Sequence, residues 1–408
     1  MFTKFYSASH ITFHGIRITQ ALKTAAFDTS RKFTCFTTTE VLSSSRYGAQ
    51  TNFIQTTAPM GKNIIPRLLG RYKNTDSHGP ASMPSLQSQN ISQPSNKTDL
   101  TPRYQDWHEF NPSTQKWSCV DATSSRHLPP IFQAIDHNAD LVLATWNIDA
   151  GEVLPQLRTS AILSHLSNLS PSPDIILLQE VSRPSLEFIL GDERIRETWL
   201  SSEMDSKNWG GQIFATMTLL SRARFSGRAR AGPVWRVKYN SRYERDALCC
   251  DIFLPSTNLE SASGEEDEKR VRLVNVHLDS LARVPSYRPH QLGIVASSLR
   301  SAECGLVAGD FNPVLPEDET LVEENGLVDA WQELRRGEEG FTWGIDGKQA
   351  YPPKRMDKVA LRGLVARDIE VMDPGTIVEP GGEYAGQGGG RLLPWSDHSG
   401  LRCTFGLA

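Results

Sequence analysis

The 408-residue chain carries a formal net charge of -4, and 38% of its residues are hydrophobic, a composition typical of a globular protein with a sizeable core. Its longest apolar runs have the length of strands, so the sequence predicts no membrane-spanning helix and no stable membrane association. The six cysteines show neither a Cys-x-x-Cys pair nor a framework spacing, which argues against a disulfide scaffold or a cysteine zinc site.

Positive charge gathers near the N-terminus. Residues 1–100 hold 11 Lys and Arg against 4 Asp and Glu, which leaves the remainder of the chain acidic. An acidic body lacks the broad positive surface of a non-specific duplex binder, so any contact with nucleic acid should be local.

Residues 1–103 are predicted to be a disordered basic segment, because Ser, Thr, Asn, Gln and Pro dominate it and no hydrophobic period is sustained. Its first 27 residues contain Lys4, Arg17 and Lys23 but no acidic residue, as mitochondrial transit peptides do. A transit peptide and an untargeted basic tail explain this pattern equally well.

A folded domain is expected over residues 104–408. Its first segment carries large apolar side chains that are expected to pack on the core: Tyr104, Trp107, Phe110 and Trp117. Hydrophobic patterning then predicts a strand at 139–151, a helix at 156–169 and a strand at 174–182, which together make a right-handed βαβ unit with a parallel strand pair.

Further strands and one more helix follow along the chain. The strands are predicted at 213–222, 246–255, 270–280, 304–312, 355–362 and 400–405, and the helix at 288–302. Short links mixed with βα crossovers predict an α/β fold of two packed mixed sheets flanked by helices. An acidic loop at 261–270 and a glycine-rich loop at 379–391 are predicted to be surface insertions.

Charged, amide and imidazole side chains follow one predicted apolar strand after another, where ordinary turn-forming residues would be expected. They are Asn147 and Asp149, Glu180, His277 and Asp279, Asp310 and Asn312, Asp357, and Asp397 with His398. Alternate residues of a strand share a face, so Asp310 and Asn312 are expected to point the same way, although an ordinary turn explains that pair taken alone. Because open sheets gather ligands at strand ends, the whole set predicts one site.

The residue types in this set suit phosphodiester hydrolysis. Asp149 and Glu180 offer hard oxygen ligands for Mg²⁺, with Mn²⁺ as the alternative. Asp310 can activate the attacking water, while Asn147 and Asn312 can position the water and the phosphate.

The last two members of the set supply a positive charge. A protonated His398 can hold a phosphoryl oxygen, and Asp357 can orient its imidazole.

The chain resembles the endonuclease/exonuclease/phosphatase family. The family signatures stand here in the family's order as "TWNID" (145–149), "LQE" (178–180), "HLDS" (277–280), "GDFN" (309–312), "RMD" (355–357) and "SDH" (396–398). The resemblance implies a DNase I-like, four-layered α/β sandwich that binds Mg²⁺ through Asp149 and Glu180. It also implies that Asp310 handles the nucleophilic water and that Asp357 supports His398.

Within this family, "LQEV", "HLDS" followed by "RPHQL", and "FTW" at 341–343 are similar to the tyrosyl-DNA phosphodiesterase 2 branch. That branch releases a protein tyrosine from a 5′ DNA phosphate and uses single-stranded DNA in a narrow groove. The resemblance implies a protein that binds DNA ends or single-stranded segments, with His277 and Trp343 as substrate contacts. We expect a monomer, and the transit-peptide-like N-terminal segment predicts a location in the nucleus or a mitochondrion and no secretion. Two departures, Ala150 for a glycine and Gln212 for an aromatic residue, leave the substrate open.

Other interpretations remain for the same residues. Another phosphodiester, in abasic DNA, RNA or a phospholipid head group, would need the same chemistry, and a non-catalytic scaffold would need only the fold. His277 and Trp343 could be core residues and Asp279 a turn former, while Asp397 could bind a metal-bound water or set the angle of the loop before His398.

Overall fold

The structure is a computed structural model, and it describes residues 99–120, 140–151, 153–227, 229–255, 268–302, 304–379 and 391–408. The predicted N-terminal segment up to residue 98 and most of the two predicted insertions lie outside these residues. The first described strand, β1 (Arg103–Gln105), begins one residue before the predicted start of the folded domain.

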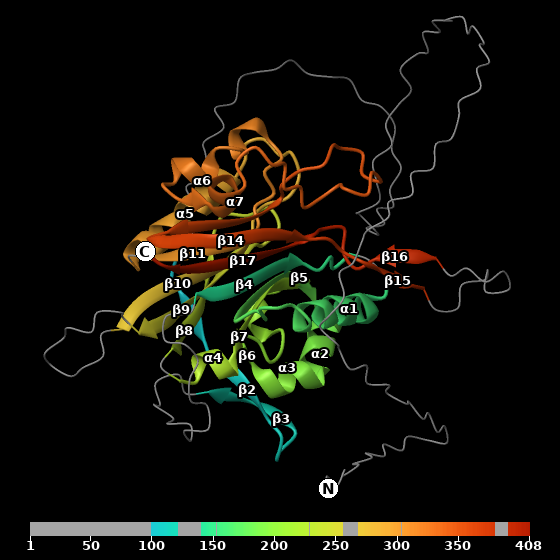
Figure 1. The fold of residues 1–408 in the computed structure, drawn as a ribbon, viewed down its shortest axis with the longest axis vertical. Coiled ribbons are helices and arrows are strands. Elements are labelled where there is room, and N and C mark those ends of the chain that lie inside the picture. Colours follow the sequence, from blue (N-terminus) through green and yellow to red (C-terminus); the bar gives the residue numbers. More distant parts are fainter. Residues whose placement is uncertain are drawn as a thin grey trace, which may run out of the picture. The chain divides into compact units, whose positions relative to one another are not determined.

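Two large mixed β-sheets form the body of this part of the chain (Figure 1). The first sheet has the order β1, β8 (Arg230–Lys238), β9 (Asp246–Pro255), β10 (Glu268–His277), β11 (Cys304–Asp310), β13 (Asp357–Arg362) and β12 (Val328–Asp329). The second has the order β14 (Leu364–Met372), β17 (Gly400–Leu407), β4 (Leu141–Asn147), β5 (Ile175–Ser182), β7 (Phe214–Ser221), β6 (Trp199–Ser201), β2 (Trp107–Asn111) and β3 (Lys116–Val120). A separate hairpin pairs β15 (Thr376–Val378) with β16 (Leu392–Pro394).

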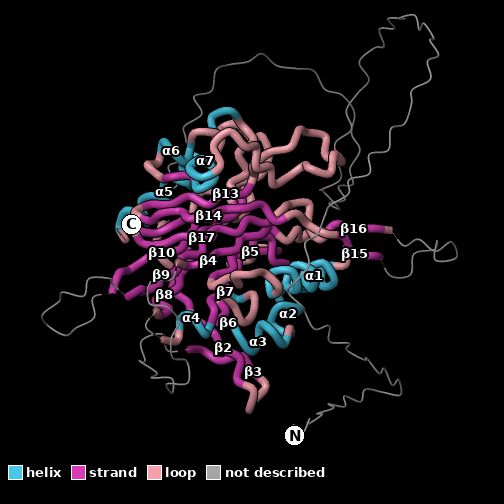
Figure 2. The backbone as a smooth tube through the Cα atoms, viewed as in Figure 1, coloured by secondary structure: helices cyan, strands magenta, loops and turns pink. Residues whose placement is uncertain are grey.

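Helices cover the outer faces of both sheets, as Figure 2 shows. The helices on the outer faces are α1 (Pro155–Ser167), α2 (Arg183–Gly191), α3 (Glu193–Thr198), α5 (Arg288–Ser301) and α6 (Leu321–Glu324). Two short helices, α4 (Arg222–Phe225) and α7 (Ala330–Leu334), instead contribute side chains to the apolar cluster between the sheets, and two 3₁₀ turns, η2 (Lys207–Trp209) and η3 (Pro316–Asp318), complete the set. None of the described helices is long and apolar enough to span a membrane.

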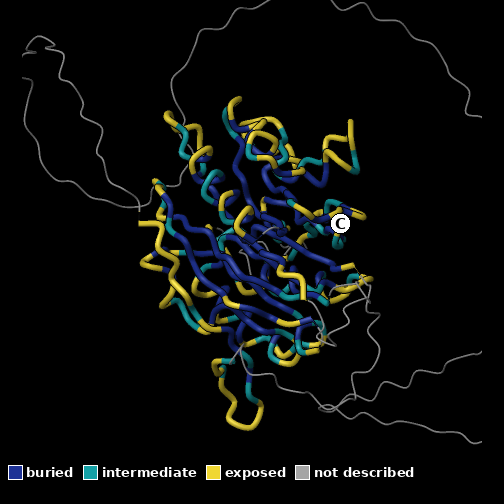
Figure 3. The backbone as a smooth tube through the Cα atoms, turned by 90° about the vertical axis from the view of Figure 1, so that its left-hand side faces the viewer, coloured by how far each residue is buried: buried dark blue, intermediate teal, exposed yellow. Residues whose placement is uncertain are grey.

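Three apolar clusters hold the layers together, and Figure 3 shows the strands as the buried centre. One cluster lies between the sheets and joins residues such as Leu143 and Leu177 to Leu273 and Leu306. The second packs α1, α2 and α3 on the second sheet, and the third packs α5 and α6 on the first sheet. The predicted four-layered α/β sandwich is therefore confirmed.

Two crossovers bring parallel strand ends to one rim. In the unit β4–α1–β5, Asn147 pairs in register with Gln179, and in the unit β10–α5–β11, His277 pairs in register with Asp310. A buried hydrogen bond of 2.8 Å from Gln179 Nε2 to Asn275 Oδ1 ties the two sheets just behind that rim. The strand ends of both sheets therefore face the same region.

The predicted aromatic segment packs as expected with one exception. Trp107 and Phe110 are buried, and Trp117 packs on the cluster below α2. Tyr104 was expected in the core, but it is 70% exposed, and its ring lies at a tilt of 43° to that of Trp235, with 5.8 Å between the centroids. The exposure follows from β1 being the edge strand of its sheet.

Candidate active site

Asn147 joins the ends of the two sheets. Its side-chain amide Nδ2 donates to Asp310 Oδ2 at 3.1 Å and to Glu180 Oε1 at 3.3 Å. Asn147 is only 1% exposed, so these two bonds fix its amide. Asn147 and Asp310, at the ends of β4 and β11, are thus brought together with Glu180, as the sequence pattern predicts, although Glu180 lies at a register shift within β5 and not at its end.

Three residues of this region have left-handed backbone conformations that non-glycine residues seldom adopt. They are Asp149 (φ 57°), Glu180 (φ 56°) and Asn312 (φ 46°). Such conformations cost free energy and persist where the surrounding structure imposes them, which is common at functional sites. Here the backbone N–H of Ala150 donates to Glu180 Oε2 at 3.0 Å. This bond holds the loop that follows β4 against β5 at Glu180.

The expectation that Asp310 and Asn312 share a strand face is wrong. Strand β11 ends at Asp310, whose Oδ1 accepts the backbone N–H of Asn312 at 2.9 Å, so the chain turns at once. The Asn312 side chain donates to the carbonyl of Leu278 at 3.2 Å. Asn312 therefore links the loop after β11 to the end of β10.

His277 is buried and held in one tautomer. Its Nδ1 lies 2.9 Å from Arg245 Nη1, which can only donate, so Nδ1 accepts and Nε2 carries the proton. Nε2 faces Asp310 Oδ2 at 3.4 Å. Burial lowers the pKa of His277 well below its usual value, and the charges of Arg245 and His398 lower it further, so the ring is neutral.

His398 is buried in the opposite charge state. Its Nδ1 lies 2.8 Å from Asp357 Oδ2, and although burial opposes it, this carboxylate raises the pKa of His398 well above its usual value. Nε2 is 4.0 Å from Asp310 Oδ2 and 4.0 Å from Asp397 Oδ1, beyond hydrogen-bond length. The protonated Nε2–H of His398 therefore points toward Asp310 and Asp397 without forming a hydrogen bond to either carboxylate.

Asp310 is the buried carboxylate between these two rings. Burial raises its pKa to about 7, with Asp357 adding to the rise and the His398 charge opposing it. A carboxyl group with a pKa near 7 can give and take a proton at neutral pH.

The two predicted metal ligands differ in their surroundings. The Asp149 carboxylate forms a 2.8 Å ion pair with Arg158, whose side chain is 2% exposed. The Glu180 side chain is 21% exposed, and among the described residues its carboxylate meets Asn147, the Ala150 amide and, at 3.9 Å, His277. No group of three or more His, Cys, Asp or Glu side chains arranged for a metal ion occurs among the described residues.

The donor chemistry fits Mg²⁺ with few protein ligands. This ion usually binds through one or two carboxylates and keeps several waters, so a partly exposed Glu180 beside Asp149 suits it. Since Arg158 already neutralises Asp149, Glu180 is the better placed of the two for direct contact with a cation.

The remaining predicted residues have clear positions. Trp343 is half-buried, pairs through its backbone with His398, and donates from Nε1 to Asp397 Oδ2 at 3.2 Å. Asp279 is buried away from solvent and accepts from Ser241 Oγ at 2.5 Å and from the Arg242 amide at 2.9 Å. Asp279 thus holds the loop between β8 and β9, a role that differs from the turn former expected as its structural alternative.

Gln212 does not face solvent. It is 6% exposed, and its Nε2 donates to Asp246 Oδ2 at 3.0 Å. The departure from an aromatic residue at this position therefore serves a buried hydrogen bond.

Sequence reasoning missed three residues that support the site. Arg158 and Arg245 each hold a predicted site residue, and the Ser396 hydroxyl donates to the carbonyl of Asn147 at 2.6 Å while accepting the His398 amide at 3.0 Å. A signal existed for Arg158, which falls on the apolar face of the predicted helix at 156–169. Arg245 gave no local signal, because its partner is 32 positions away.

Comparisons with known proteins agree with the motif order. The model described as the endonuclease/exonuclease/phosphatase family matches residues 144–398. A search of curated proteins finds no match.

Solved structures similar to the chain include three from different organisms. TDP2 of D. rerio, complexed with a single-strand DNA product, is 20% identical over 65% of this chain and 98% of that chain, with a TM-score of 0.47. TDP2 from C. elegans is 20% identical over 65% of this chain and 75% of its own, with a TM-score of 0.46. A family protein from Bacteroides thetaiotaomicron is 10% identical over 66% and 99%, with a TM-score of 0.46.

The family match covers more than half of the chain and includes both parallel crossovers and every signature motif. The two packed mixed sheets are the DNase I-like architecture of that family. The chain therefore belongs to the endonuclease/exonuclease/phosphatase family.

Proposed function

We propose that the protein is a Mg²⁺-dependent phosphodiesterase that hydrolyses phosphodiesters at DNA ends, with the 5′-phosphotyrosyl bond as its substrate. The observation that carries the hydrolytic part is the convergence of a titratable carboxyl, Asp310, with a cationic imidazole, His398, and a neutral one, His277. Family membership supports this reading, because the motifs that define the family supply these residues.

The residues divide the work of in-line hydrolysis as follows. Asp310 takes the proton of the attacking water at Oδ2, which Asn147 and His277 orient by donating toward it. His398 donates from Nε2 to a phosphoryl oxygen, and Asp357 holds its ring and its charge. Asn312 keeps the loop after β11 in place through the Leu278 carbonyl.

Glu180, with Asp149 beside it, is proposed to hold Mg²⁺. When bound there, the ion would neutralise charge on the phosphate and on the leaving oxygen. Glu180 suits this role because its carboxylate is partly exposed, whereas the Asp149 carboxylate is held by its ion pair with the buried Arg158.

The DNA-end substrate is supported by the motifs of the tyrosyl-DNA phosphodiesterase 2 branch and by Trp343. The half-buried indole lies next to His398 through the backbone bridge, where it can stack on a base of a single strand. We further propose that the protein acts as a monomer in the nucleus or a mitochondrion, where the basic N-terminal segment would direct it.

A side-by-side assay tests the proposal. The full chain is given 5′-tyrosyl single-stranded DNA, an abasic duplex and poly(A) RNA, each with Mg²⁺, with Mn²⁺ and with excess chelator. We expect Mg²⁺-dependent release of tyrosine to exceed cleavage of the other two substrates. Faster cleavage of abasic DNA or RNA would mean that one of these is the substrate instead of the 5′-phosphotyrosyl bond. Equal rates with Mg²⁺ and with chelator would exclude a metal-dependent mechanism. If none of the substrates is hydrolysed, the protein is better explained as a non-catalytic scaffold.

Two variants make the assay specific to the site. His398→Gln keeps the ring's approximate size and one polar donor but removes the cation, so turnover should fall. Glu187→Gln alters an exposed carboxylate of α2 and should behave as the unaltered protein.

A further inference from the structure

A break in the register of strand β5 determines where Glu180 points. Leu178 pairs in register with Met217 of β7, and the next pair in register is Val181 with Ala215. Two residues of β5 therefore stand opposite one residue of β7, and Glu180 is one of the two, with its left-handed φ of 56°. An extra residue of this kind bends the strand and redirects a side chain.

A regular strand would turn Glu180 toward the helices. Ile176 and Leu178 belong to the apolar cluster beneath α1 and α2, and strict alternation would add Glu180 to the same face. Val181 takes that position instead, because the extra residue changes which side chains alternate. The Glu180 side chain is thereby left at the rim, where it is 21% exposed.

Asn275 of the opposite sheet holds the backbone beside this break. Its Nδ2 donates to the carbonyl of Leu178 at 3.1 Å and to the carbonyl of Met217 at 2.9 Å, and these two residues form the last pair in register. Its Oδ1 accepts from Gln179 Nε2 at 2.8 Å. Asn275 is only 1% exposed, so a single buried amide, with both of its donors and its oxygen bonded, joins the two strands that flank the break.

The position of Asn275 in β10 links this contact to the candidate active site. Asn275 and His277 are two residues apart, so their side chains share the face that meets the second sheet. His277 Nε2 lies 3.4 Å from Asp310 Oδ2 and 3.9 Å from Glu180 Oε1. A shift of β10 against β5 would therefore change the spacing between Glu180 and Asp310.

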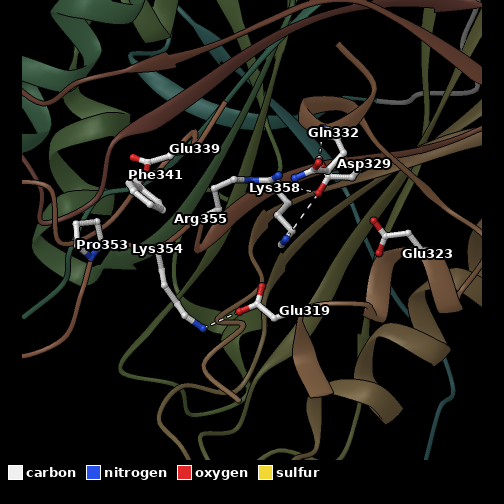
Figure 4. Close-up of a pocket in the computed structure, with 10 residues that line it drawn as sticks. All are labelled: Glu319, Glu323, Asp329, Gln332, Glu339, Phe341, Pro353, Lys354, Arg355 and Lys358. Carbon is white, nitrogen blue, oxygen red and sulfur yellow. Dashed lines mark hydrogen bonds and ion pairs between the residues drawn. The ribbon is translucent and has the colours of Figure 1, made fainter. Parts of the chain in front are cut away.

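The ion pairs around β13 act differently. In the pocket that Figure 4 shows, Lys358 pairs with Asp329 at 3.6 Å. Lys354 pairs there with Glu319 at 2.7 Å. Both pairs join β13 and the segment before it to β12 and to the chain after η3, so they stay within the first sheet and its loops. The side-chain hydrogen bonds of Asn275, in contrast, cross to the second sheet and act on the spacing of the two rims.

Hydrogen bonds can fix this geometry where apolar packing cannot. Burial of apolar side chains between the sheets is non-directional, whereas a hydrogen bond weakens steeply when its angle changes. The left-handed backbone of Glu180 costs free energy and persists because the surrounding structure imposes it. The three bonds of Asn275 lie where they can impose it.

We propose that Asn275 is a positioning residue for metal binding, whose side-chain amide fixes the break in β5 so that the Glu180 carboxylate points to the rim. This inference deepens the proposed function and rests on its assignment of Mg²⁺ to Glu180. Asn275 acts through Glu180 and touches neither metal nor substrate. Removing the group that orients a metal ligand commonly lowers metal affinity by about 10- to 100-fold.

The test uses Asn275→Val, which removes all three bonds and introduces a residue that strands favour. Binding of Mn²⁺ to the full chain without nucleic acid is measured from the electron paramagnetic resonance of the unbound ion, and we expect it to be at least about 10-fold weaker in the variant. NMR of the metal-free protein gives a second readout. The Ala150 amide donates to Glu180 Oε2, so we expect its proton resonance to shift when the carboxylate moves.

Leu273→Ala is the matched control for stability. Leu273 lies two residues before Asn275 in β10, is fully buried, and belongs to the apolar cluster between the sheets. The cavity left by this change destabilises the fold, as urea unfolding will show, but no hydrogen bond at the break is lost. Mn²⁺ affinity and the Ala150 resonance should therefore stay as they are in the unaltered protein.

A second variant keeps the test decisive if circular dichroism shows that Asn275→Val does not fold. Asn275→Ser also removes the direct bonds, but its small hydroxyl leaves room for a water that can satisfy the same carbonyls. The same weaker binding of Mn²⁺ and the same shift of the Ala150 resonance are expected from it.

Glu180→Gln separates this inference from the proposed function. If Glu180→Gln weakens Mn²⁺ binding and the Asn275 variant does not, the metal assignment stands and Asn275 does not position its ligand. If Glu180→Gln leaves Mn²⁺ binding unchanged, Glu180 does not hold the ion, and the metal assignment fails together with this inference. Equal losses of affinity in Leu273→Ala and the Asn275 variant, or an unmoved Ala150 resonance in the latter, would also overturn the inference.

Discussion

Arg245 Nη1 lies 2.9 Å from His277 Nδ1, and this contact determines which nitrogen of the imidazole carries the proton. A guanidinium has no acceptor, so His277 must accept at Nδ1 and donate at Nε2. The donated proton faces Asp310 Oδ2, the same oxygen that Nε2 of the cationic His398 approaches at 4.0 Å. The site thus places one neutral and one charged imidazole around a single titratable carboxyl.

The first prediction concerns this contact. Arg245→Met removes a cation that lowers the pKa of His277, so that pKa should rise toward its usual value while burial still keeps it low. NMR titration of the His277 ring in metal-free protein measures the change. Arg242→Met is the matched control, because Arg242 stacks on Tyr287 and does not contact His277. An unchanged titration of His277 in the Arg245 variant would show that the guanidinium does not act on the ring.

The second prediction concerns His398. Asp357 is the main group that raises the pKa of His398, so Asp357→Asn should lower that pKa. Because the folded-state pKa of His398 is the higher one, its protonation stabilises the fold fully below the unfolded value near 6.5, and the contribution is lost as pH rises through the folded value. NMR titration of His398 is the measurement, and a ring that still titrates well above 6.5 in the variant would contradict the assignment.

Much of the fold follows from strand and helix patterns in the sequence. Strand β9 matches its predicted range of 246–255, and helix α5 ends within one residue of the predicted range of 288–302. Both elements have long, uninterrupted patterns, and local sequence is enough to define them. The strand-end residues were also identifiable, because polar side chains after apolar strands are unusual.

Strand β8 could not be predicted in the same way. It contains Gly232 and Pro233, which normally argue against a strand. The structure places them where the register with β9 shifts between Ala231 and Val234, so an irregularity in the ladder absorbs both residues. Such an irregularity depends on the partner strand and leaves no local pattern.

The features that hold the site residues in place were equally difficult to predict from the sequence. Asp149 and Glu180 have left-handed backbones, and Arg245 fixes the tautomer of His277 from 32 positions away in the sequence. These features depend on which loops meet at the rim, and single-sequence patterns do not contain that information.

The third prediction tests Glu180 as a metal ligand. Glu180→Gln removes one ligand charge but keeps the size of the side chain, so the Mg²⁺ concentration for half-maximal activity should rise and turnover should fall. Activity is measured across a Mg²⁺ titration, with Glu187→Gln as the control on the surface of α2. If turnover at limiting Mg²⁺ is the same in both variants, Glu180 does not hold the ion.

The fourth prediction separates chemistry from binding at Asp310. Asp310→Asn removes the proton acceptor but preserves a side chain that can still bond the Asn312 amide, so the chemical rate should fall by about 10²-fold or more. Single-turnover rates and substrate affinity are measured together, and affinity should change little. A variant that keeps the full rate would exclude Asp310 as the base.

The fifth prediction concerns the glycine that precedes Asp310. Gly309 has φ of 133°, and a Cβ at this position would overlap the carbonyl oxygen of Val276 in the neighbouring parallel strand. Both the backbone conformation and the close approach of β10 therefore exclude a side chain, and Gly309→Ala should destabilise the protein by about 3 kcal/mol or more. Gly293→Ala is the matched control, because Gly293 lies within helix α5 and the nearest atom to its added Cβ outside the surrounding helical turns would be Asn325 Oδ1 at 3.9 Å. That change should stabilise the fold by about 0.5 to 1 kcal/mol through helix propensity. Urea unfolding of both variants gives the two free energies, and equal values would mean that β10 and β11 can move apart at the rim without cost.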